Sequence, residues 1–458
     1  MVLWVWILGA AVAALVLPYA LSADMAWHLQ WGIELNHGEL PTYGTGLAGP
    51  TLHPLGLLLG SLAGATGHGY DVLALAGPVS FAGVVVMTWR LGWVSFGLLG
   101  GIVAAALAAV TASVMDYTLT FFVDSAFVVV VLMGVTLIAV APDRGIGPLV
   151  AFGIAGLLRP EAWLFSAVYW VYVAFRGVRV RRLVLLTILA ASGGILWALC
   201  DLVVAGDLLY SLTRTQEGAR KLDRTTGLGH VPKSLIDFVR DGVRPGIMIG
   251  ASAAFVLVMV LRRRSMVAIA GFTATAGCTY VVLGAADVSL LPRYTIAFQV
   301  GLTLLFAWLV TGWEHESTHR RAWLIAATAA AAAALVSVHS RANSVDRSVS
   351  ATQIRQDAVN GLNRIAHGPT VEHFSRVCRP RGVVDALAQP FLEYFSSLPP
   401  GSYSFERFTA QRTGIKVTTE NARILGSFSL TAPDDTRPGP GFRRVAANAS
   451  WEAAVKDC

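Results

Sequence analysis

The chain has 458 residues, of which 55% are hydrophobic and only 14% are charged. Soluble domains carry about 25% charged residues, so this composition excludes a soluble protein and indicates a membrane protein with several spans. The net charge of +7 does not indicate nucleic-acid binding, because the arginines lie between apolar segments, where membrane topology explains them.

Eleven apolar segments are candidate transmembrane helices, since a span needs about 20 predominantly apolar residues. In chain order they are 2–21, 72–89, 94–113, 124–141, 146–158, 161–175, 183–204, 245–261, 266–285, 295–312 and 322–339. The first run lacks a small-residue cleavage site near its end, which favours a retained anchor. The short, Gly-rich run 54–66 is expected to lie in the membrane interface or dip into it.

The basic residues of the short connections set the predicted orientation. With the N-terminus in the cytoplasm, every inner connection is basic, whereas the outer loops 22–71 and 114–123 contain no Lys or Arg. We therefore expect a multi-pass protein of the cell membrane. Its transmembrane domain covers 1–339, with a long outer loop at 205–244, and its C-terminal domain, 340–458, lies outside the cytoplasm.

The C-terminal segment has a different composition from the spans. Residues 353–368 have a helical pattern, and the stretch 401–435 has the alternation and β-branched residues typical of strands. We predict a small α+β domain there. Cys378 and Cys458 are expected either to form a disulfide outside the cytoplasm or to remain free thiols.

Charges that topology does not require point to function, since a charge in or beside a membrane is costly. Five such sites fall on the predicted outer face. The first four are Asp24, Asp124, Arg159 with Glu161, and Arg293. The fifth is the basic loop 205–244, whose cations include Arg214, Arg220 and Lys221. The guanidinium group suits phosphate oxygens, and a partly desolvated carboxylate can accept a proton. The pattern predicts group transfer from a lipid phosphate to a hydroxyl.

Structural roles remain open for each site. Asp24 and Asp124 could cap helices, and Arg159 could pair with Glu161 to seal a helix break. Arg293 could extend to lipid headgroups, and the basic loop could bind acidic headgroups without any chemistry.

A metal site is a further hypothesis. Asp24 and His28, together with His37 or Asp124, could hold Mg²⁺ or Mn²⁺ through carboxylate and imidazole groups. No established metal-binding spacing is present, and the sequence requires no cofactor.

Four short motifs, in this order, resemble the GT-C superfamily of integral-membrane glycosyltransferases. They are an Asp after the first span with "GELP" and "HPL" behind it, then "FFVDSAFVVV", "LLRPEAW" and "LLPRYTIAF". The resemblance covers about residues 1–312 and is nearest to the bacterial cell-envelope arabinosyl- and mannosyltransferases. It implies a GT-C-like fold, a polyprenyl-phosphate sugar donor, and inversion at the anomeric carbon by direct attack.

The resemblance also implies roles for individual residues. Asp24 matches the catalytic base, although Ala23 replaces the acid that often precedes it, which puts a metal requirement in doubt. Asp124 matches a second-loop acid that helps to bind metal or acceptor in some members, and Arg159 and Arg293 match positions that meet the donor phosphate. Together with the charge pattern, this leads to two expected groups. We expect Asp124, His28, His53 and Glu161 to position the acceptor or the first loop, and the donor phosphate to be held by Arg159, Arg293, Tyr294 and one or more of Arg214, Arg220 and Lys221.

The predicted function is therefore transfer of a sugar from a polyprenyl phosphate to a hydroxyl of a cell-envelope glycan or glycolipid. The expected partners are this donor, the acceptor and membrane lipid, without nucleic acid. The alternatives are a transporter of lipid-linked intermediates and a non-catalytic scaffold.

Overall fold

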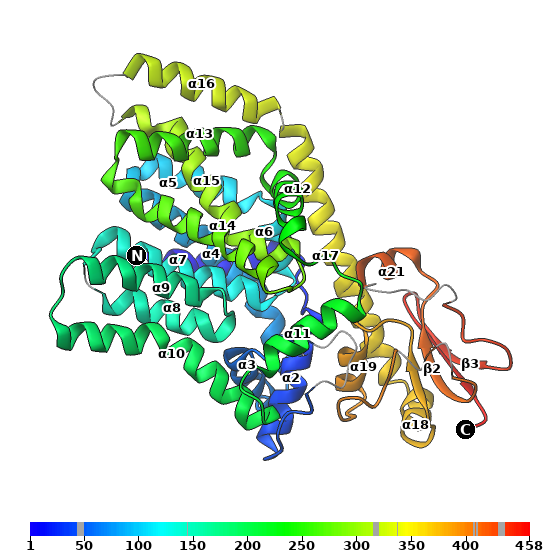
Figure 1. The fold of residues 1–458 in the computed structure, drawn as a ribbon. Helices are drawn as coiled ribbons and strands as arrows, with labels where there is room; N and C mark the ends of the chain where they lie inside the picture. The colour runs from blue at the N-terminus through cyan, green and yellow to red at the C-terminus, as the bar shows by residue number, and fades with distance from the viewer. Residues whose placement is uncertain are drawn as a thin grey trace. The chain divides into compact units, whose positions relative to one another are not determined.

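The computed structural model describes residues 1–43, 50–143, 145–314, 320–336, 338–405, 408, 411–428 and 436–458. This part is mainly helical, with one small sheet near the C-terminal end (Figure 1). It forms two compact units. The helical unit comprises Met1–Leu17, Ala76–Cys200 and Thr225–Val349. The loop-and-sheet unit comprises Pro18–Leu75, Asp201–Arg224 and Ser350–Cys458, so it combines the first predicted outer loop with the C-terminal segment.

Most helices belong wholly or largely to the helical unit. They are α1 (Val2–Val16), α4 (Gly69–Phe96), α5 (Leu98–Ala109), α6 (Ala112–Leu119), α7 (Val123–Val140), α8 (Ile146–Leu158), α9 (Ala162–Phe175), α10 (Val180–Ala205), η1 (Leu228–His230), α12 (Val231–Val243), α13 (Pro245–Leu261), η2 (Arg264–Met266), α14 (Val267–Ala285), η3 (Pro292–Thr295), α15 (Ile296–Thr311), η4 (Gly312–Glu314) and α16 (Arg320–Val336). The helix α17 (Val338–Ala366) begins in this unit, but its longer part, from Ser350 on, belongs to the loop-and-sheet unit.

Five segments are long and apolar enough to cross a membrane: Gly69–Phe96, Val123–Val140, Val180–Ala205, Arg264–Ala285 and Pro292–Glu314. Two bent pairs, α5 with α6 and Leu228–Val243 with α13, raise the number to seven if each pair is one span. Every predicted apolar segment overlaps a helix, but α1, α8, α9 and the apolar part of α16 are shorter apolar helices of 10–17 residues. Among the described residues, the chain is thus a multi-pass membrane protein with five to seven candidate spans.

The helix α15 lies at the centre of the helical unit. It packs against α5, α13 and α14, and 89% of its most apolar window is buried. The helix α10 is only 17% buried, although its mean hydropathy of 2.3 exceeds the value of 1.7 for the segment that contains α15. An apolar helix left uncovered by its own protein suits contact with lipid chains.

The loop-and-sheet unit contains the remaining elements. They are α2 (Ala23–Asn36), α3 (Pro54–Gly64), α11 (Tyr210–Lys221), α18 (Pro369–Val377), β1 (Arg381–Val383), α19 (Gln389–Phe395), β2 (Gly414–Thr418), α21 (Ala422–Phe428), β3 (Arg443–Ala447) and β4 (Glu452–Lys456). The strands form a mixed sheet in the order β1-β2-β4-β3, in which β1 and β2 are parallel and the other pairs are antiparallel.

The predicted strands of the C-terminal segment are confirmed in part. Within 401–435, Gly414–Thr418 forms β2, but Ala422–Phe428 is helical, and residues 406–407, 409–410 and 429–435 lie outside the described part. The helix begins there because the side chain of Asn421 accepts a hydrogen bond from the Arg423 amide at 3.0 Å. The strands β3 and β4 lie beyond the stretch for which strands were predicted.

Two glycines allow α2 and α3 to pack closely. A Cβ atom on Gly32 would overlap the backbone of Gly60 and Ser61, and one on Gly60 would overlap the backbone carbonyl of His28. The short Gly-rich run predicted to lie at the interface is therefore a helix packed directly on α2.

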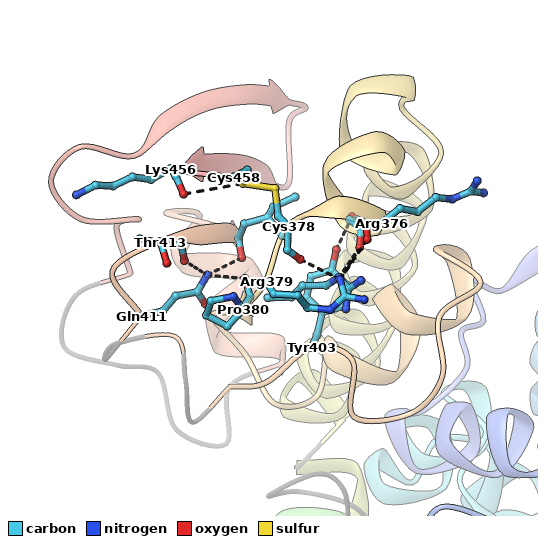
Figure 2. The surroundings of a disulfide bond; sticks show 12 residues. Arg376, Cys378, Arg379, Pro380, Tyr403, Gln411, Thr413, Lys456 and Cys458 are labelled. Atoms are coloured by element: carbon cyan, nitrogen blue, oxygen red, sulfur yellow. Dashed lines mark hydrogen bonds between the residues drawn. A yellow bond between two sulfur atoms is a disulfide. The ribbon is translucent and has the colours of Figure 1, made fainter.

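A disulfide joins Cys378, which follows α18, to Cys458, which follows β4 (Figure 2). It connects residues 80 positions apart in the chain. The side chain of Arg379 donates a hydrogen bond to the carbonyl of Cys378 at 2.9 Å beside it. The end of the chain is thus attached covalently to the helical part of its own unit.

Candidate functional site

Asp24 lies in the first turn of α2 but does not cap this helix. The cap is Ser22, whose Oγ accepts a hydrogen bond from the amide of Met25 at 3.2 Å. Asp24 is partly exposed, and its negative charge is favoured near the positive end of the helix dipole. Helix capping therefore does not explain why a carboxylate is placed here.

His28 supports the first loop as a neutral imidazole. Its Nε2 accepts a hydrogen bond from the amide of His53 at 3.1 Å, so the proton must be on Nδ1, which donates to the carbonyl of Asp24 at 2.6 Å. Complete burial lowers the pKa of His28 to about 4, which keeps the ring uncharged at neutral pH. The ring also stacks on His53, with centroids 5.3 Å apart.

Because both ring nitrogens of His28 are already in hydrogen bonds, this side chain does not fit the role of metal ligand in the observed arrangement. Among the described residues, no group of three or more His, Cys, Asp or Glu side chains is arranged to hold a metal ion. In the described part of the chain, His28 and Asp24 therefore do not form a metal site as they are arranged.

The helix α11 is fastened to the first loop within the loop-and-sheet unit. The hydroxyls of Thr51 and Thr215 are 2.6 Å apart, and the rings of Tyr43 and Tyr210 are 5.3 Å apart. At the start of α11, the buried carboxylate of Asp201 accepts hydrogen bonds from the backbone and hydroxyl of Ser211, at 2.9 and 2.6 Å. These contacts hold α11 at a defined place beside the first loop.

The three cations that the sequence assigned to the donor phosphate on this loop lie on α11. Arg214 and Lys221 share one carboxylate, that of Glu217, at 3.0 and 2.8 Å, and Arg220 is exposed. With three cations to one carboxylate, this part of α11 keeps an excess of positive charge. Such a surface suits a phosphate group.

Four charged residues meet inside the helical unit, which we call the ion cluster: Asp124, Arg159, Glu161 and Arg293. Arg159, at the break between α8 and α9, donates to Asp124 at 2.6 Å and to both oxygens of Glu161 at 3.1 Å from its Nε. Arg293 lies farther away, with its Nε 3.9 Å from Asp124. Tyr294 completes the site, since the Arg159 guanidinium lies 4.3 Å from its ring centroid.

The ion cluster is compact and electrically balanced. Its side chains are 4–17% exposed, and they enclose a cavity of only about 10 Å³, which is about the size of one water molecule. As placed, Arg159 is occupied by two carboxylates and leaves no room for a phosphate. Arg293 has the most exposed side chain of the four, at 17%.

The structure thus brings the predicted residues together in two groups. The ion cluster with Tyr294 forms one group in the helical unit; Asp24, His28 and His53, with the cations of α11, belong to the loop-and-sheet unit. Sequence reasoning missed Ser22 and Asp201. Ser22 could have been found as a capping residue just before the helix that starts at Ala23. Asp201 could have been found as a carboxylate near the end of the predicted span 183–204.

Solved structures resemble this fold over nearly all of its length. ArnT from Cupriavidus metallidurans, bound to undecaprenyl phosphate, aligns with a TM-score of 0.55 and 12% identity over 98% of this chain and 97% of that chain. The apo state of ArnT gives a TM-score of 0.52 and 13% identity. AglB, the oligosaccharyltransferase of Archaeoglobus fulgidus, was solved in complex with an inhibitory peptide and a dolichol-phosphate. It aligns with a TM-score of 0.56 and 10% identity over 91% of this chain and 69% of that chain.

Comparisons of sequence alone add nothing to this result. The chain matches no protein-family model and no curated protein. At identities of 10–13%, the similarity of the structures establishes the fold alone.

Proposed function

Because the chain has the fold of the GT-C glycosyltransferases, the class of ArnT and AglB, we propose that it transfers a sugar from a polyprenyl phosphate to a hydroxyl of a cell-envelope glycan or glycolipid. The observation that carries the proposal is the full-length likeness to ArnT, which was solved with undecaprenyl phosphate bound. The location of Asp24 in the first turn of the helix after the first apolar segment supports it.

In the proposed reaction, Asp24 is the general base. The carboxylate takes the proton of the acceptor hydroxyl, and the hydroxyl oxygen forms a bond to the anomeric carbon of the donor sugar. The bond between this carbon and the phosphate oxygen breaks, and its electron pair stays on the phosphate. Direct attack inverts the anomeric configuration and releases the polyprenyl phosphate.

Basic side chains stabilise the charge that develops on the leaving phosphate. In the loop-and-sheet unit these are Arg214, Arg220 and Lys221 on α11, where Glu217 pairs with Arg214 and Lys221. In the helical unit, Arg293 is the best candidate, because its side chain is the most exposed of the ion cluster, at 17%.

Arg159 has a different role in this proposal. Its bonds to Asp124 and Glu161 and its contact with Tyr294 hold the residues around Arg293 in place. His28 and His53 play the same part for Asp24, since their hydrogen bonds fix the first turn of α2 relative to the start of α3.

We further propose the membrane arrangement that the basic connections predicted. The shorter apolar helices α1, α8, α9 and α16 cross as well, which brings the number of spans to eleven, and the N-terminus is cytoplasmic. The loop 22–71 and the segment after α16 are then outside the cytoplasm.

The test is transfer activity of Asp24→Asn, measured with a panel of polyprenyl-phosphate sugars and reconstituted full-length protein. We expect transfer to fall by about 10²–10⁴-fold, as for loss of a general base. The matched control is Asp223→Asn, an exposed residue at φ 46°, a backbone conformation that asparagine adopts readily. Equal activity of both variants would exclude the proposed mechanism.

The same variants separate an enzyme from a transporter or a scaffold. A protein that only moves lipid-linked intermediates across the bilayer should do so equally well with Asn at position 24, and should leave the donor sugar attached to its phosphate. Sugar release that depends on Asp24 would exclude both alternatives.

A further inference from the structure

A large cavity lies within the loop-and-sheet unit, away from the ion cluster. Its volume is about 720 Å³, which is in the range of small-molecule sites. Its walls come from the C-terminal part of α2, the start of α4, the end of α17, and α19 with the turn after it. Nothing assigned so far to donor binding or proton transfer uses this cavity.

The lining of the cavity is acidic and rich in hydrogen-bonding groups. Four carboxyl groups line it, those of Glu34, Glu39, Asp71 and Glu393, together with three histidines and two side-chain amides. Among the described residues that line it, none is Lys or Arg. A phosphate or an acidic sugar would be repelled here, whereas uncharged hydroxyl groups find both donors and acceptors.

Glu393 is the most distinctive group in this lining, because it is completely buried. Its Oε1 accepts hydrogen bonds from the Tyr403 amide at 2.8 Å and from the Gln389 side chain at 3.1 Å. Its Oε2 has no hydrogen-bond partner among the described residues. Burial raises the pKa of Glu393 to about 8, although the bond from Tyr403 opposes the shift, so the group is mainly a neutral acid at pH 7.

Aromatic rings provide the apolar part of the lining. Tyr70, Tyr394 and Phe395 all line the cavity, and the Phe395 ring lies 5.6 Å from that of Tyr70 and 5.4 Å from that of Tyr394. The Phe395 ring is inclined by 60° to that of Tyr70 and by 64° to that of Tyr394, so the rings offer separate apolar faces and edges to the C–H groups of a sugar ring. Flat rings beside convergent polar groups are a common composition for ligand sites.

We propose that this cavity binds an uncharged sugar unit of the acceptor glycan. The proposal deepens the function proposed above and rests on it for the identity of the ligand as an acceptor. Gln30, which lines the cavity, follows Asp24 by six residues on α2, a rise of about 9 Å along the helix. A glycan held in the cavity therefore lies along the same helix as the proposed base.

The test measures binding without any transfer reaction. Full-length protein in lipid nanodiscs is titrated calorimetrically with mannotetraose as the neutral probe and with tetragalacturonate as the acidic one. Asn363→Trp places a large side chain at the cavity wall on α17. The matched control is Arg364→Trp, the exposed neighbour that does not line the cavity. We expect Asn363→Trp to weaken neutral-glycan binding by at least about tenfold and the control to leave it unchanged.

A second measurement guards against misfolding as the explanation. We expect Asn363→Trp and Arg364→Trp to have the same melting temperature in nanodiscs, so that lost binding reports on the filled cavity. Preference for tetragalacturonate, absence of neutral-glycan binding, or equal binding by the two tryptophan variants would overturn the proposal.

Failure of the two proposals can be told apart. If Asp24→Asn keeps transfer activity but Asn363→Trp loses glycan binding, the proposed base is wrong and the cavity assignment stands. If Asp24→Asn loses transfer and Asn363→Trp still binds glycan, the cavity assignment is wrong and the catalytic proposal stands.

Discussion

The ion cluster of the helical unit and the first turn of α2 both contain a carboxylate that membrane topology does not require, but they support it differently. Asp124 is 3% exposed and lies 2.6 Å from a guanidinium nitrogen of Arg159. Asp24 is partly exposed, and its backbone carbonyl accepts a hydrogen bond from His28. A buried carboxylate that is strongly paired holds structure together, whereas a partly exposed carboxylate can be reached by an acceptor hydroxyl and take its proton.

The largest effect is expected from breaking the ion cluster. Arg159→Gln leaves Asp124 and Glu161 buried without their strongest cation, which costs about 3–5 kcal/mol of unfolding free energy. Thermal unfolding in detergent measures this loss. Arg293→Gln is the matched comparison, and it should cost less because the Arg293 side chain is 17% exposed, whereas that of Arg159 is 7% exposed. Equal destabilisation by both variants would contradict the hierarchy within the cluster.

A smaller effect is expected where α2 meets α3. Gly60→Ala forces a methyl group against the His28 carbonyl and should destabilise the loop-and-sheet unit by about 1–3 kcal/mol. Gly218→Ala on α11 is the control, since a Cβ there meets no atom within 4 Å and raises helix propensity. Proteolysis of the first loop reports on the unit. Faster cleavage of the control than of Gly60→Ala would refute the close packing.

Two titrating groups make the stability of the loop-and-sheet unit depend on pH in opposite directions. Folding lowers the pKa of His28 from 6.5 to about 4, so its folded state binds fewer protons, and stability falls as the pH drops from 6.5 towards 4. Folding raises the pKa of Glu393 from 4.5 to about 8, so its stabilising contribution is present below pH 4.5 and is lost as the pH rises towards 8.

Glu393→Gln isolates the second of these contributions. The melting temperature of the wild type should fall relative to that of the variant as the pH rises from 5 to 8.5, because only the wild type must lose a buried proton. Differential scanning fluorimetry at the two pH values checks this. A difference that does not change with pH would show that Glu393 titrates normally.

The smallest effect concerns the cations of α11. Glu217→Gln removes the shared partner of Arg214 and Lys221, and because these pairs are exposed, stability should change by less than about 1 kcal/mol. If the cations bind the donor phosphate, the KM for the donor should fall a few-fold at low salt and the gain should vanish at high salt. An increase in KM would place the donor phosphate elsewhere.

The sequence predicted those features that depend on local composition. Each apolar run overlaps a helix because length and hydropathy are local properties, and β2 follows from a short β-branched run. The charges of the ion cluster were selected because topology did not require them, and four of them meet in space. The sequence alone left open whether Arg159 pairs with the other charges, since Arg159 and Glu161 flank a proline and their side chains could face either way.

Features that depend on distant parts of the chain could not be predicted. Gln30 donates to the carbonyl of Pro390 at 2.7 Å, a contact between residues 360 positions apart, and the cavity around Glu393 exists because of such contacts. In the same way, α21 is a helix where strands were expected, because the cap at Asn421 outweighs the β-branched residues before it. Single-residue caps are weak signals beside a longer pattern.

The most direct test of the account compares Asp24→Asn with Asp124→Asn in the same two measurements, the transfer rate and the melting temperature. We predict that Asp24→Asn keeps the melting temperature of the wild type and loses transfer, and that Asp124→Asn unfolds at a markedly lower temperature because Arg159 and Arg293 lose this carboxylate as an ion-pair partner. Retained transfer in Asp24→Asn, or an unchanged melting temperature in Asp124→Asn, would contradict the account.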